Sequence, residues 1–131
     1  MNRPKLTIII PAYNEINTIQ ELINKISNLK IDKQIILIDD NSKDGTNEII
    51  KKNSNKLDKI ITHDENMGKG AAIKSAQKFV EGQYVVIQDA DLEYDPNDII
   101  NLLNEIENKK CQAVYGSRVL RNPKNKKSQN F

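Results

Sequence analysis

Short runs of aliphatic residues alternate along the chain with segments of helical periodicity, and this alternation limits the possible folds more than any other feature. Strand-like runs occupy residues 6–10, 34–38, 59–62, 84–87 and 113–115. Runs of this composition suit strands that are buried on both faces of a sheet. Between them, apolar residues recur at helical spacing over residues 16–29, 71–80 and 96–108, with a shorter helix after Thr46. The alternation predicts an α/β fold with a mostly parallel, doubly wound sheet and helices on both faces.

The fourth run stops at a cluster of acids. Asp89 and Asp91 follow it directly, and Glu93 stands two residues further on. In open α/β sheets, ligands bind at the carboxyl ends of the strands. The Asp-x-Asp spacing is typical of a Mg²⁺ or Mn²⁺ ion that joins carboxylates to a diphosphate. Acids after a strand are also ordinary turn and helix-capping residues, so both interpretations are open for this pair. We assign Asp95 to capping because Pro96 follows it.

Polar residues follow the other strand-like runs as well. Residues 13–15 follow the first run, Asp39 and Asp40 follow the second, and Arg118 follows the fifth. Because parallel strands end at the same edge of a sheet, we expect these side chains to share one crevice with the acids. An aromatic ring and acids can hold a base and ribose, while a metal, Lys69 and Arg118 can neutralise a diphosphate. The convergence predicts a nucleotide diphosphate site.

A loop with two glycines precedes the third expected helix. Gly68 and Gly70 flank Lys69, and two alanines follow them. One interpretation is that the glycines let an anion approach the helix N-terminus, assisted by the lysine. The other is that the small residues let this helix pack close to the sheet. His63, the only histidine, is expected to be a loop residue rather than a ligand or general base, because no second His or Cys accompanies it.

The composition is that of a soluble single domain. The chain has 131 residues, and no apolar stretch approaches the ~20 residues of a membrane-spanning helix. It begins without the apolar region of a signal peptide, and its single cysteine, Cys111, excludes an internal disulfide. These features indicate a cytoplasmic protein. Basic residues are not interleaved with aromatic ones, which disfavours nucleic-acid binding.

Charge divides the chain into two parts. Residues 118–131 carry five basic side chains and no acid, so removing them from the net charge of +2 leaves −3 for the rest. We assign residues 1–118 to a nucleotide-binding core. Residues 119–131 are expected to be a flexible basic tail or the start of an acceptor-binding region.

Five stretches of the chain resemble the family 2 glycosyltransferases, especially the dolichol-phosphate and polyprenol-phosphate mannosyltransferases and glucosyltransferases. They follow the family's order and comprise residues 7–15, 39–46, 66–70, 89–93 and 115–118. The resemblance implies a GT-A fold, a nucleotide-sugar donor such as GDP-mannose or UDP-glucose, and Mg²⁺ or Mn²⁺. It also implies a polyprenyl-phosphate or glycan acceptor and inversion at the anomeric carbon. Family members continue well past the last stretch, so we expect these residues to form an incomplete transferase. The missing part is expected to make any contact with the inner face of the membrane.

The resemblance also implies roles for particular residues. In the family, Asp-x-Asp holds the metal against the donor diphosphate, which assigns Asp89 and Asp91 here, with Ala90 lining the site. Glu93 stands where the mannosyltransferases often have Gln as a further metal ligand. Arg118 would approach a donor or acceptor phosphate. The pocket for the base and ribose would be formed by Pro11, Tyr13, Glu15, Ile38 and Asp40.

Other functional classes fit the sequence less well. A non-catalytic module that binds a nucleotide sugar is the main alternative. A signalling receiver requires its acidic pair after the first strand, where this chain has Pro11. A dinucleotide-dependent dehydrogenase would carry Gly-x-Gly-x-x-Gly at the same place, and that motif is absent.

Overall fold

A computed structural model of the chain describes residues 3–92, 95–109 and 118–121. Strands and helices alternate in these ranges, as the sequence predicts. The strands form one sheet in the order β3-β2-β1-β4-β5, with β1, β2, β3 and β4 parallel. The elements are β1 (Leu6–Ala12), α1 (Ile19–Ser27), β2 (Lys33–Asp39), α2 (Thr46–Lys52), the 3₁₀ turn η1 (Ser54–Lys56), β3 (Lys59–Thr62), α3 (Lys69–Gln77), β4 (Tyr84–Ile87), α4 (Asp98–Lys109) and β5 (Arg118–Arg121).

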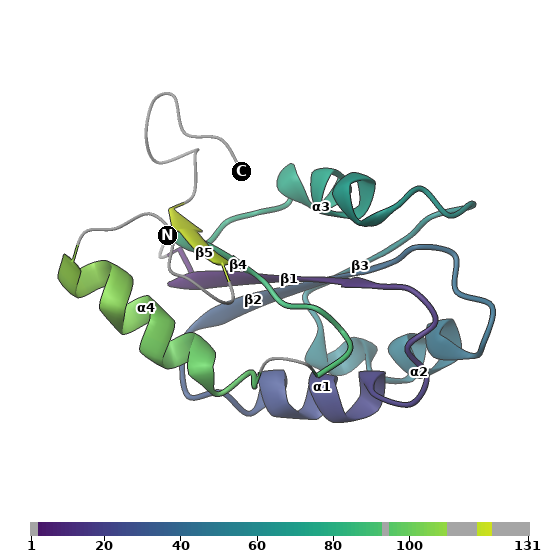
Figure 1. Ribbon diagram of the computed structural model, residues 1–131, viewed down its shortest axis with the longest axis horizontal. Coiled ribbons are helices and arrows are strands. Elements are labelled where there is room, and N and C mark those ends of the chain that lie inside the picture. Colours follow the sequence, from purple (N-terminus) through teal and green to yellow (C-terminus); the bar gives the residue numbers. More distant parts are fainter. Residues whose placement is uncertain (1–2, 93–94, 110–117, 122–131) are drawn as a thin grey trace.

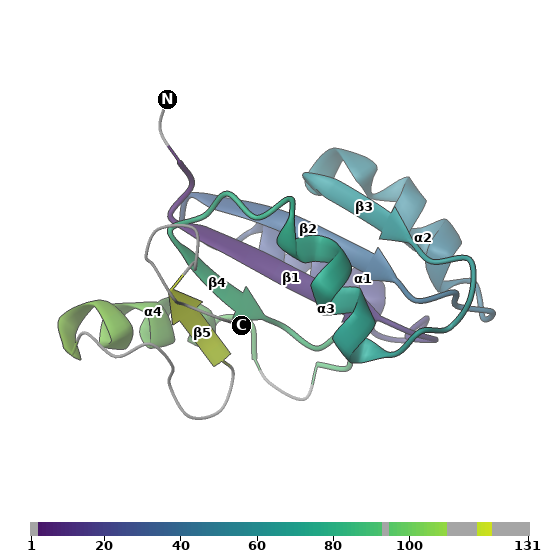
Figure 2. The same ribbon diagram turned by 90° about the horizontal axis from the view of Figure 1, so that it is seen from above.

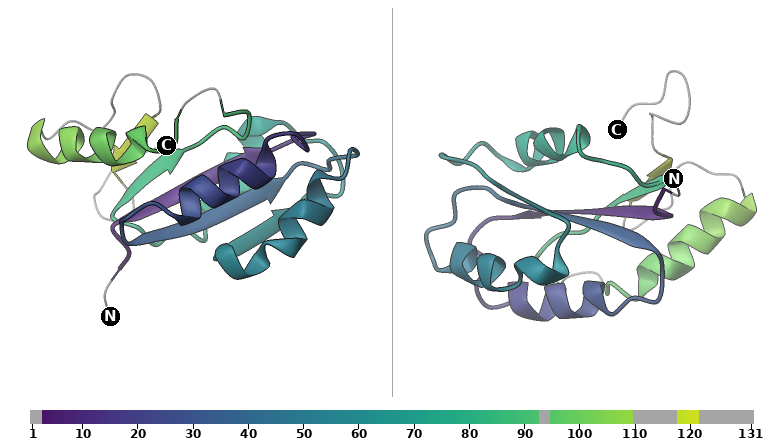
Figure 3. Two further views of the ribbon diagram at one scale, coloured as in Figure 1. Left: turned by 90° about the horizontal axis from the view of Figure 1, so that it is seen from below. Right: turned by 180° about the vertical axis from the view of Figure 1, so that it is seen from behind.

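The helices cover both faces of the sheet. Figure 1 shows α3 on one face and α1, α2 and α4 on the other, and the view from behind in Figure 3 shows the same layers. Strand side chains alternate between faces. Ile8 and Ile10 pack in the core with α1 and α4, whereas Ile9 packs under α3. The helix α3 lies over β1 and β2 (Figure 2). The prediction of a doubly wound sheet with helices on both faces is confirmed.

The helices are short. The longest of those described, α4, has 12 residues. None of the helices in the described ranges is both long enough and apolar enough to cross a membrane. Asp95 begins the turn that leads into α4, where its side-chain oxygen accepts the amide of Asn97 at 2.9 Å and its carbonyl accepts the amide of Asp98. The side chain of Asp95 thus closes a turn ahead of α4 and is not the N-cap predicted from the sequence, because the helix begins three residues later, at Asp98.

The last strand differs in direction from the other four. β5 is antiparallel to β4, and Arg118 pairs with Ile87. The predicted strand at 113–115 lies outside the described residues. An antiparallel strand begins where its neighbour ends, so the backbone of Arg118 still lies at the edge of the sheet that carries the acids.

A buried polar network closes the opposite edge of the sheet. The Thr7 hydroxyl donates to the side-chain oxygen of Gln34 at 2.6 Å and accepts the amide of Gly82 at 2.8 Å. The Gln34 amide group donates in turn to the Phe79 carbonyl at 2.8 Å. A Cβ at Gly82 would lie 2.5 Å from the backbone nitrogen of Thr7. Only glycine therefore lets the segment between α3 and β4 approach β1 this closely.

We expect Gly82→Ala to lower the free energy of unfolding by about 1–3 kcal/mol, because the added methyl group meets the backbone of β1. Urea unfolding followed by circular dichroism measures this change. The matched control is Gly70→Ala in the first turn of α3, where a Cβ meets nothing within 4 Å. This control should be neutral or stabilising, because alanine favours helix by up to about 1 kcal/mol over glycine. Equal effects of both substitutions would contradict the packing argument.

Candidate functional site

A cavity opens at the carboxyl edge of the sheet because its central strands differ in length. β4 pairs with β1 only as far as Ile9, whereas β2 accompanies β1 to Ala12. The gap beyond Ile9 lies where the strand order reverses direction, which is the usual ligand position in open α/β sheets. The cavity has a volume of about 180 Å³. Typical small-molecule pockets hold about 300–1,000 Å³, so a ligand of nucleotide size would extend past the rim.

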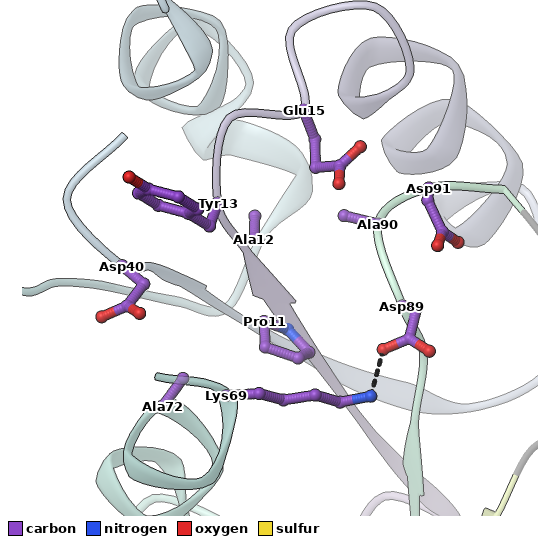
Figure 4. A pocket seen from close by; sticks show the side chains of 10 residues that line it. All are labelled: Pro11, Ala12, Tyr13, Glu15, Asp40, Lys69, Ala72, Asp89, Ala90 and Asp91. Carbon is purple, nitrogen blue, oxygen red and sulfur yellow. Dashed lines mark ion pairs between the residues drawn. The ribbon is translucent and has the colours of Figure 1, made fainter. Parts of the chain in front are cut away.

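Most of the predicted site residues line this cavity (Figure 4). Its walls come from the ends of β1, β2 and β4 and from the first turns of α3. Two further residues, Ala12 and Ala72, line it without having been singled out from the sequence. The predicted residues that the fold brings together here are Pro11, Tyr13, Glu15, Asp40, Lys69, Asp89, Ala90 and Asp91.

Three predicted residues stand apart from that group. Ile38 is fully buried in the hydrophobic cluster under α3, with Ala72 and Ala76, and does not line the cavity. Glu93 lies outside the described residues. For Arg118 only the backbone is described, at the start of β5 beside the end of β4.

The loop after β1 is held by the loop after β2. The Asn14 amide donates to the Ser42 hydroxyl at 2.9 Å, and the Glu15 amide donates to the Thr46 hydroxyl at 2.9 Å. The Asp44 carboxylate accepts the Ile16 amide at 3.2 Å. Partial burial raises the pKa of Asp44, but hydrogen bonds from the Thr46 hydroxyl and amide and from Ile16 outweigh it, so the pKa is lowered. Backbone amides thus fix the position of the loop that carries Tyr13 and Glu15.

Asp40 fastens the loop between β3 and α3 to the rim of the cavity. One carboxylate oxygen accepts the Met67 amide at 2.9 Å and the Nδ1 of His63 at 2.8 Å, and the other accepts the Gly68 amide at 2.8 Å. The Nε2 of His63 lies 2.9 Å from the Ser75 hydroxyl on α3. Burial raises the pKa of Asp40, yet the bonds from Met67, His63 and Gly68 together lower it. We name this arrangement the Asp40 clasp.

The clasp gives His63 a role that its sequence context did not reveal. His63 lies in the loop after β3, as expected, but it is only 8% exposed and joins two elements. A carboxylate can only accept hydrogen bonds, so Nδ1 carries the proton shared with Asp40. A lone histidine between a strand and a glycine loop carries no local signal for such a partner, because both partners are distant in sequence.

The turn with the two acids is held from two sides. The Thr18 hydroxyl donates to the Ala90 carbonyl at 2.6 Å, and the Lys69 ammonium lies 2.5 Å from Asp89. Thr18 is the N-cap of α1, but its hydroxyl makes no bond to the helix amides. Instead it anchors the acidic turn, a role that sequence reasoning missed. In the sequence, a threonine just before a helix predicts an N-cap and gives no indication of this contact.

The donor set of the turn suits a divalent metal shared with a ligand. In the described part of the chain, no group of three or more His, Cys, Asp or Glu side chains is placed to hold a metal. Mg²⁺ and Mn²⁺ are commonly bound by one or two carboxylates together with substrate phosphates and water. Asp89 and Asp91 offer such a pair on the cavity wall, and Asp89 is already neutralised by a cation, the Lys69 ammonium. These residues therefore fit a metal that a phosphate ligand helps to hold.

The glycines before and within the first turn of α3 border open space rather than the sheet. Gly68 has a φ of +96°, and a Cβ at either Gly68 or Gly70 would meet nothing within 4 Å. Close packing against the sheet therefore does not require these two glycines, whereas Ala72 and Ala76 are fully buried against it. The packing interpretation applies to the alanines. Open space above the glycines is consistent with an approaching ligand.

We expect Asp40→Asn to lower the free energy of unfolding at about pH 7 by about 1.5–3 kcal/mol, the value of hydrogen bonds to a charged group. The lowered pKa of Asp40 stabilises the fold fully above the unfolded-state pKa of about 3.9, and this contribution is lost as the pH falls through the folded-state pKa. The difference between wild type and variant should therefore shrink below about pH 4.

Urea unfolding at pH values from about 7 to about 3 measures this difference. The matched control is Asp64→Asn, which removes the same charge from an exposed position in the same loop. We expect the control to unfold like the wild type at each pH. A stability difference for Asp40→Asn that stays constant with pH would contradict the clasp.

Relatives of known sequence place the chain in a family. Residues 7–130 match the profile of "Glycosyl transferase family 2". The chain is 33% identical over 123 residues to a dolichol-phosphate mannosyltransferase of Pyrococcus furiosus, covering 92% of this chain and 35% of the relative. It is 36% identical over 134 residues to a UDP-N-acetylglucosamine–dolichyl-phosphate N-acetylglucosaminyltransferase of Methanococcus voltae, covering 89% of this chain and 53% of the relative. The chain thus spans between a third and about half of the length of these relatives.

Solved structures with a similar fold include glycosyltransferases as well. TarS of S. aureus, residues 1–349 in complex with UDP, superposes with a TM-score of 0.71 at 26% identity, covering 83% of this chain and 34% of that TarS chain. A mannosyltransferase of Pyrobaculum calidifontis in complex with GDP-Man and Mn²⁺ gives a TM-score of 0.66 at 28% identity, covering 76% of this chain and 31% of that enzyme. The fold is that of the GT-A glycosyltransferases, and the chain belongs to glycosyl transferase family 2.

Proposed function

We propose that this chain is the donor-binding part of a glycosyltransferase that moves a sugar from a nucleotide-diphosphate sugar to a polyprenyl phosphate. One observation carries the proposal: a single cavity joins Tyr13 and Asp40 at one end to Asp89, Asp91 and Lys69 at the other (Figure 4). A nucleoside diphosphate has the same polarity, with an aromatic base at one end and a charged diphosphate at the other. The family membership and the named relatives support this assignment.

The end of the cavity near β1 and β2 would hold the nucleoside. Tyr13 is 45% exposed at the rim, where its ring could stack on a base. Pro11 and Glu15 line the same wall, and Glu15 offers a carboxylate to a ribose hydroxyl. Asp40 closes this end as part of the clasp. GDP-mannose and UDP-glucose remain the two donor classes expected from the sequence.

The end near β4 would hold the diphosphate. Asp89 and Asp91 would bind Mg²⁺ or Mn²⁺, and the bound ion would supply Lewis-acid stabilisation of the charge on the leaving diphosphate. Lys69 adds a positive charge beside Asp89. Arg118, whose backbone lies beside the end of β4, would approach a phosphate of donor or acceptor. Glu93 would serve as a further metal ligand.

The proposed transfer is a single displacement. An oxygen of the acceptor phosphate forms a bond to the anomeric carbon on the face opposite the leaving group. The bond between that carbon and the diphosphate oxygen breaks, its electron pair leaves with the nucleoside diphosphate, and the configuration inverts. A phosphate acceptor is anionic at neutral pH and needs no strong general base, whereas a hydroxyl acceptor would need one.

The polyprenyl phosphate acceptor is proposed from the named relatives and not from the described residues. The two named relatives act on dolichol phosphate or dolichyl phosphate, and both are longer than this chain. We place the protein in the cytoplasm, at the inner face of the membrane, where a polyprenyl phosphate headgroup would be accessible. Contact with the membrane would be made by parts of the protein other than the donor site.

We expect the full chain to bind one of three donors, GDP-mannose, UDP-glucose or UDP-N-acetylglucosamine, in a Mn²⁺-dependent way in calorimetry. Asp91→Ala should weaken this binding at least about 10-fold, because it removes one of two carboxylates for the metal. The matched control is Asp95→Ala, which removes an exposed acid four residues away that does not line the cavity. We expect the control to bind like the wild type.

Two outcomes would separate the alternatives. A folded chain that binds none of the three donors, or that binds them equally well after Asp91→Ala, would contradict the donor site. Donor binding without transfer of labelled sugar to a polyprenyl phosphate, measured on the same protein, would favour a non-catalytic binding module.

A further inference from the structure

An ion pair crosses the floor of the cavity between two elements that are far apart in sequence. Lys69 is the first residue of α3, and Asp89 follows β4. The Lys69 side chain extends under Pro11, and its ammonium lies 2.5 Å from a carboxylate oxygen of Asp89 (Figure 4). The two side chains are 56% and 34% exposed. Solvated pairs of this kind contribute little to stability, so the pair can open when a stronger partner arrives.

The position of Lys69 at the start of α3 favours an anion nearby. The N-terminus of a helix carries a partial positive charge, and a cation in its first turn is unfavourable. The N-cap is Gly68, which provides no side-chain bond, and the first turn contains no acid. Asp89 supplies the compensating negative charge from another element. The end of α3 thus has a positive charge that a nearby anion stabilises.

The backbone around this end is open to a ligand. The positions above Gly68 and Gly70 are empty to at least 4 Å, and Lys69 lies between them. The Asp40 clasp holds the preceding residues through the amides of Met67 and Gly68. The turn that carries Lys69 is therefore fixed at its base, while the flexible lysine side chain is free to change its partner.

We propose that Lys69 is an exchangeable cation, an inference that rests on the proposed donor site. In the ligand-free protein its ammonium neutralises Asp89 and stands in for the divalent metal. When a metal takes Asp89, the ammonium moves to the diphosphate of the donor, which becomes the anion paired with the N-terminus of α3. Each partner of the original pair gains a stronger partner, so neither charge is left unpaired at any stage.

The exchange predicts opposite effects on two ligands. In the absence of nucleotide, Lys69 competes with the metal for Asp89, so removing its charge tightens metal binding. In the presence of metal, Lys69 contacts the diphosphate, so removing it weakens nucleotide binding. Because binding couplings are reciprocal, Lys69 accounts for part of the mutual enhancement between metal and nucleotide.

The experiment compares wild type, Lys69→Met and Lys74→Met in two titrations of the full chain. Methionine keeps most of the length of lysine and removes the charge. Lys74 is an exposed lysine on the same helix that does not line the cavity, so it reports the effect of net charge alone.

The first titration measures Mn²⁺ binding without nucleotide, from the signal of free Mn²⁺ in electron paramagnetic resonance. The second measures GDP and UDP binding at saturating Mn²⁺ by calorimetry. Thermal unfolding by circular dichroism verifies that all three proteins are folded.

We expect Lys69→Met to tighten Mn²⁺ binding about 2- to 5-fold, the range for removing a partly exposed ion pair. The same variant should weaken binding of the preferred nucleoside diphosphate about 5-fold or more. Lys74→Met should change neither affinity by more than about 1.5-fold.

Other results would contradict either the exchange or the donor site itself. If Lys69→Met weakens both ligands, or behaves like Lys74→Met, the exchange is wrong while the donor site stands. If the wild-type protein binds Mn²⁺ but neither nucleotide, the proposed function itself fails. If Lys69→Met tightens Mn²⁺ binding and leaves nucleotide affinity unchanged, Lys69 never reaches the diphosphate and the exchange is overturned.

Discussion

The unequal parallel pairing of β1 with its two neighbours is the constraint on which the rest of the structure depends. β1 is the central strand of the parallel sheet, and β4 leaves it after Ile9 while β2 continues to Ala12. The cavity is the space that this difference leaves at the carboxyl edge. Because all three strands run in the same direction, the loops after them reach that edge together, which explains how residues as distant as Tyr13 and Asp91 line one cavity.

Hydrogen bonds between side chains and backbone groups turn these loops into a fixed site. Asp40 holds the start of α3, Asp44 and Thr46 hold the loop after β1, and Thr18 holds the acidic turn after β4. The lowered pKa values of Asp40 and Asp44 have the same origin, since bonds donated by amides and hydroxyls favour the charged carboxylate. Asp40 therefore both lines the cavity and determines its shape. Any effect of changing it combines binding with stability.

Charge is distributed unevenly along the cavity. At one end stand an exposed aromatic ring and a carboxylate whose oxygens are engaged by Met67, His63 and Gly68. At the other end, the positive N-terminus of α3 and Lys69 face the acids of the turn after β4. An ion pair spans that end in the ligand-free protein, so a metal and a phosphate would enter a site whose charges are already paired. The family membership places this arrangement among the family 2 glycosyl transferases.

Local sequence patterns are sufficient to predict the strands and helices and the edge of the sheet at which the site forms. Short apolar runs such as 34–38 and 84–87 predict strands without any knowledge of the rest of the fold. Because parallel strands end at the same edge of a sheet, this prediction also brings Asp40, Asp89 and Asp91 together. Tertiary packing decided the rest. Ile38 turns into the core because α3 covers its side of the sheet, and β5 is antiparallel to β4. The partners of Thr18 and His63 lie far away in the chain, and a bond between distant residues depends on how the elements pack, which local periodicity does not encode.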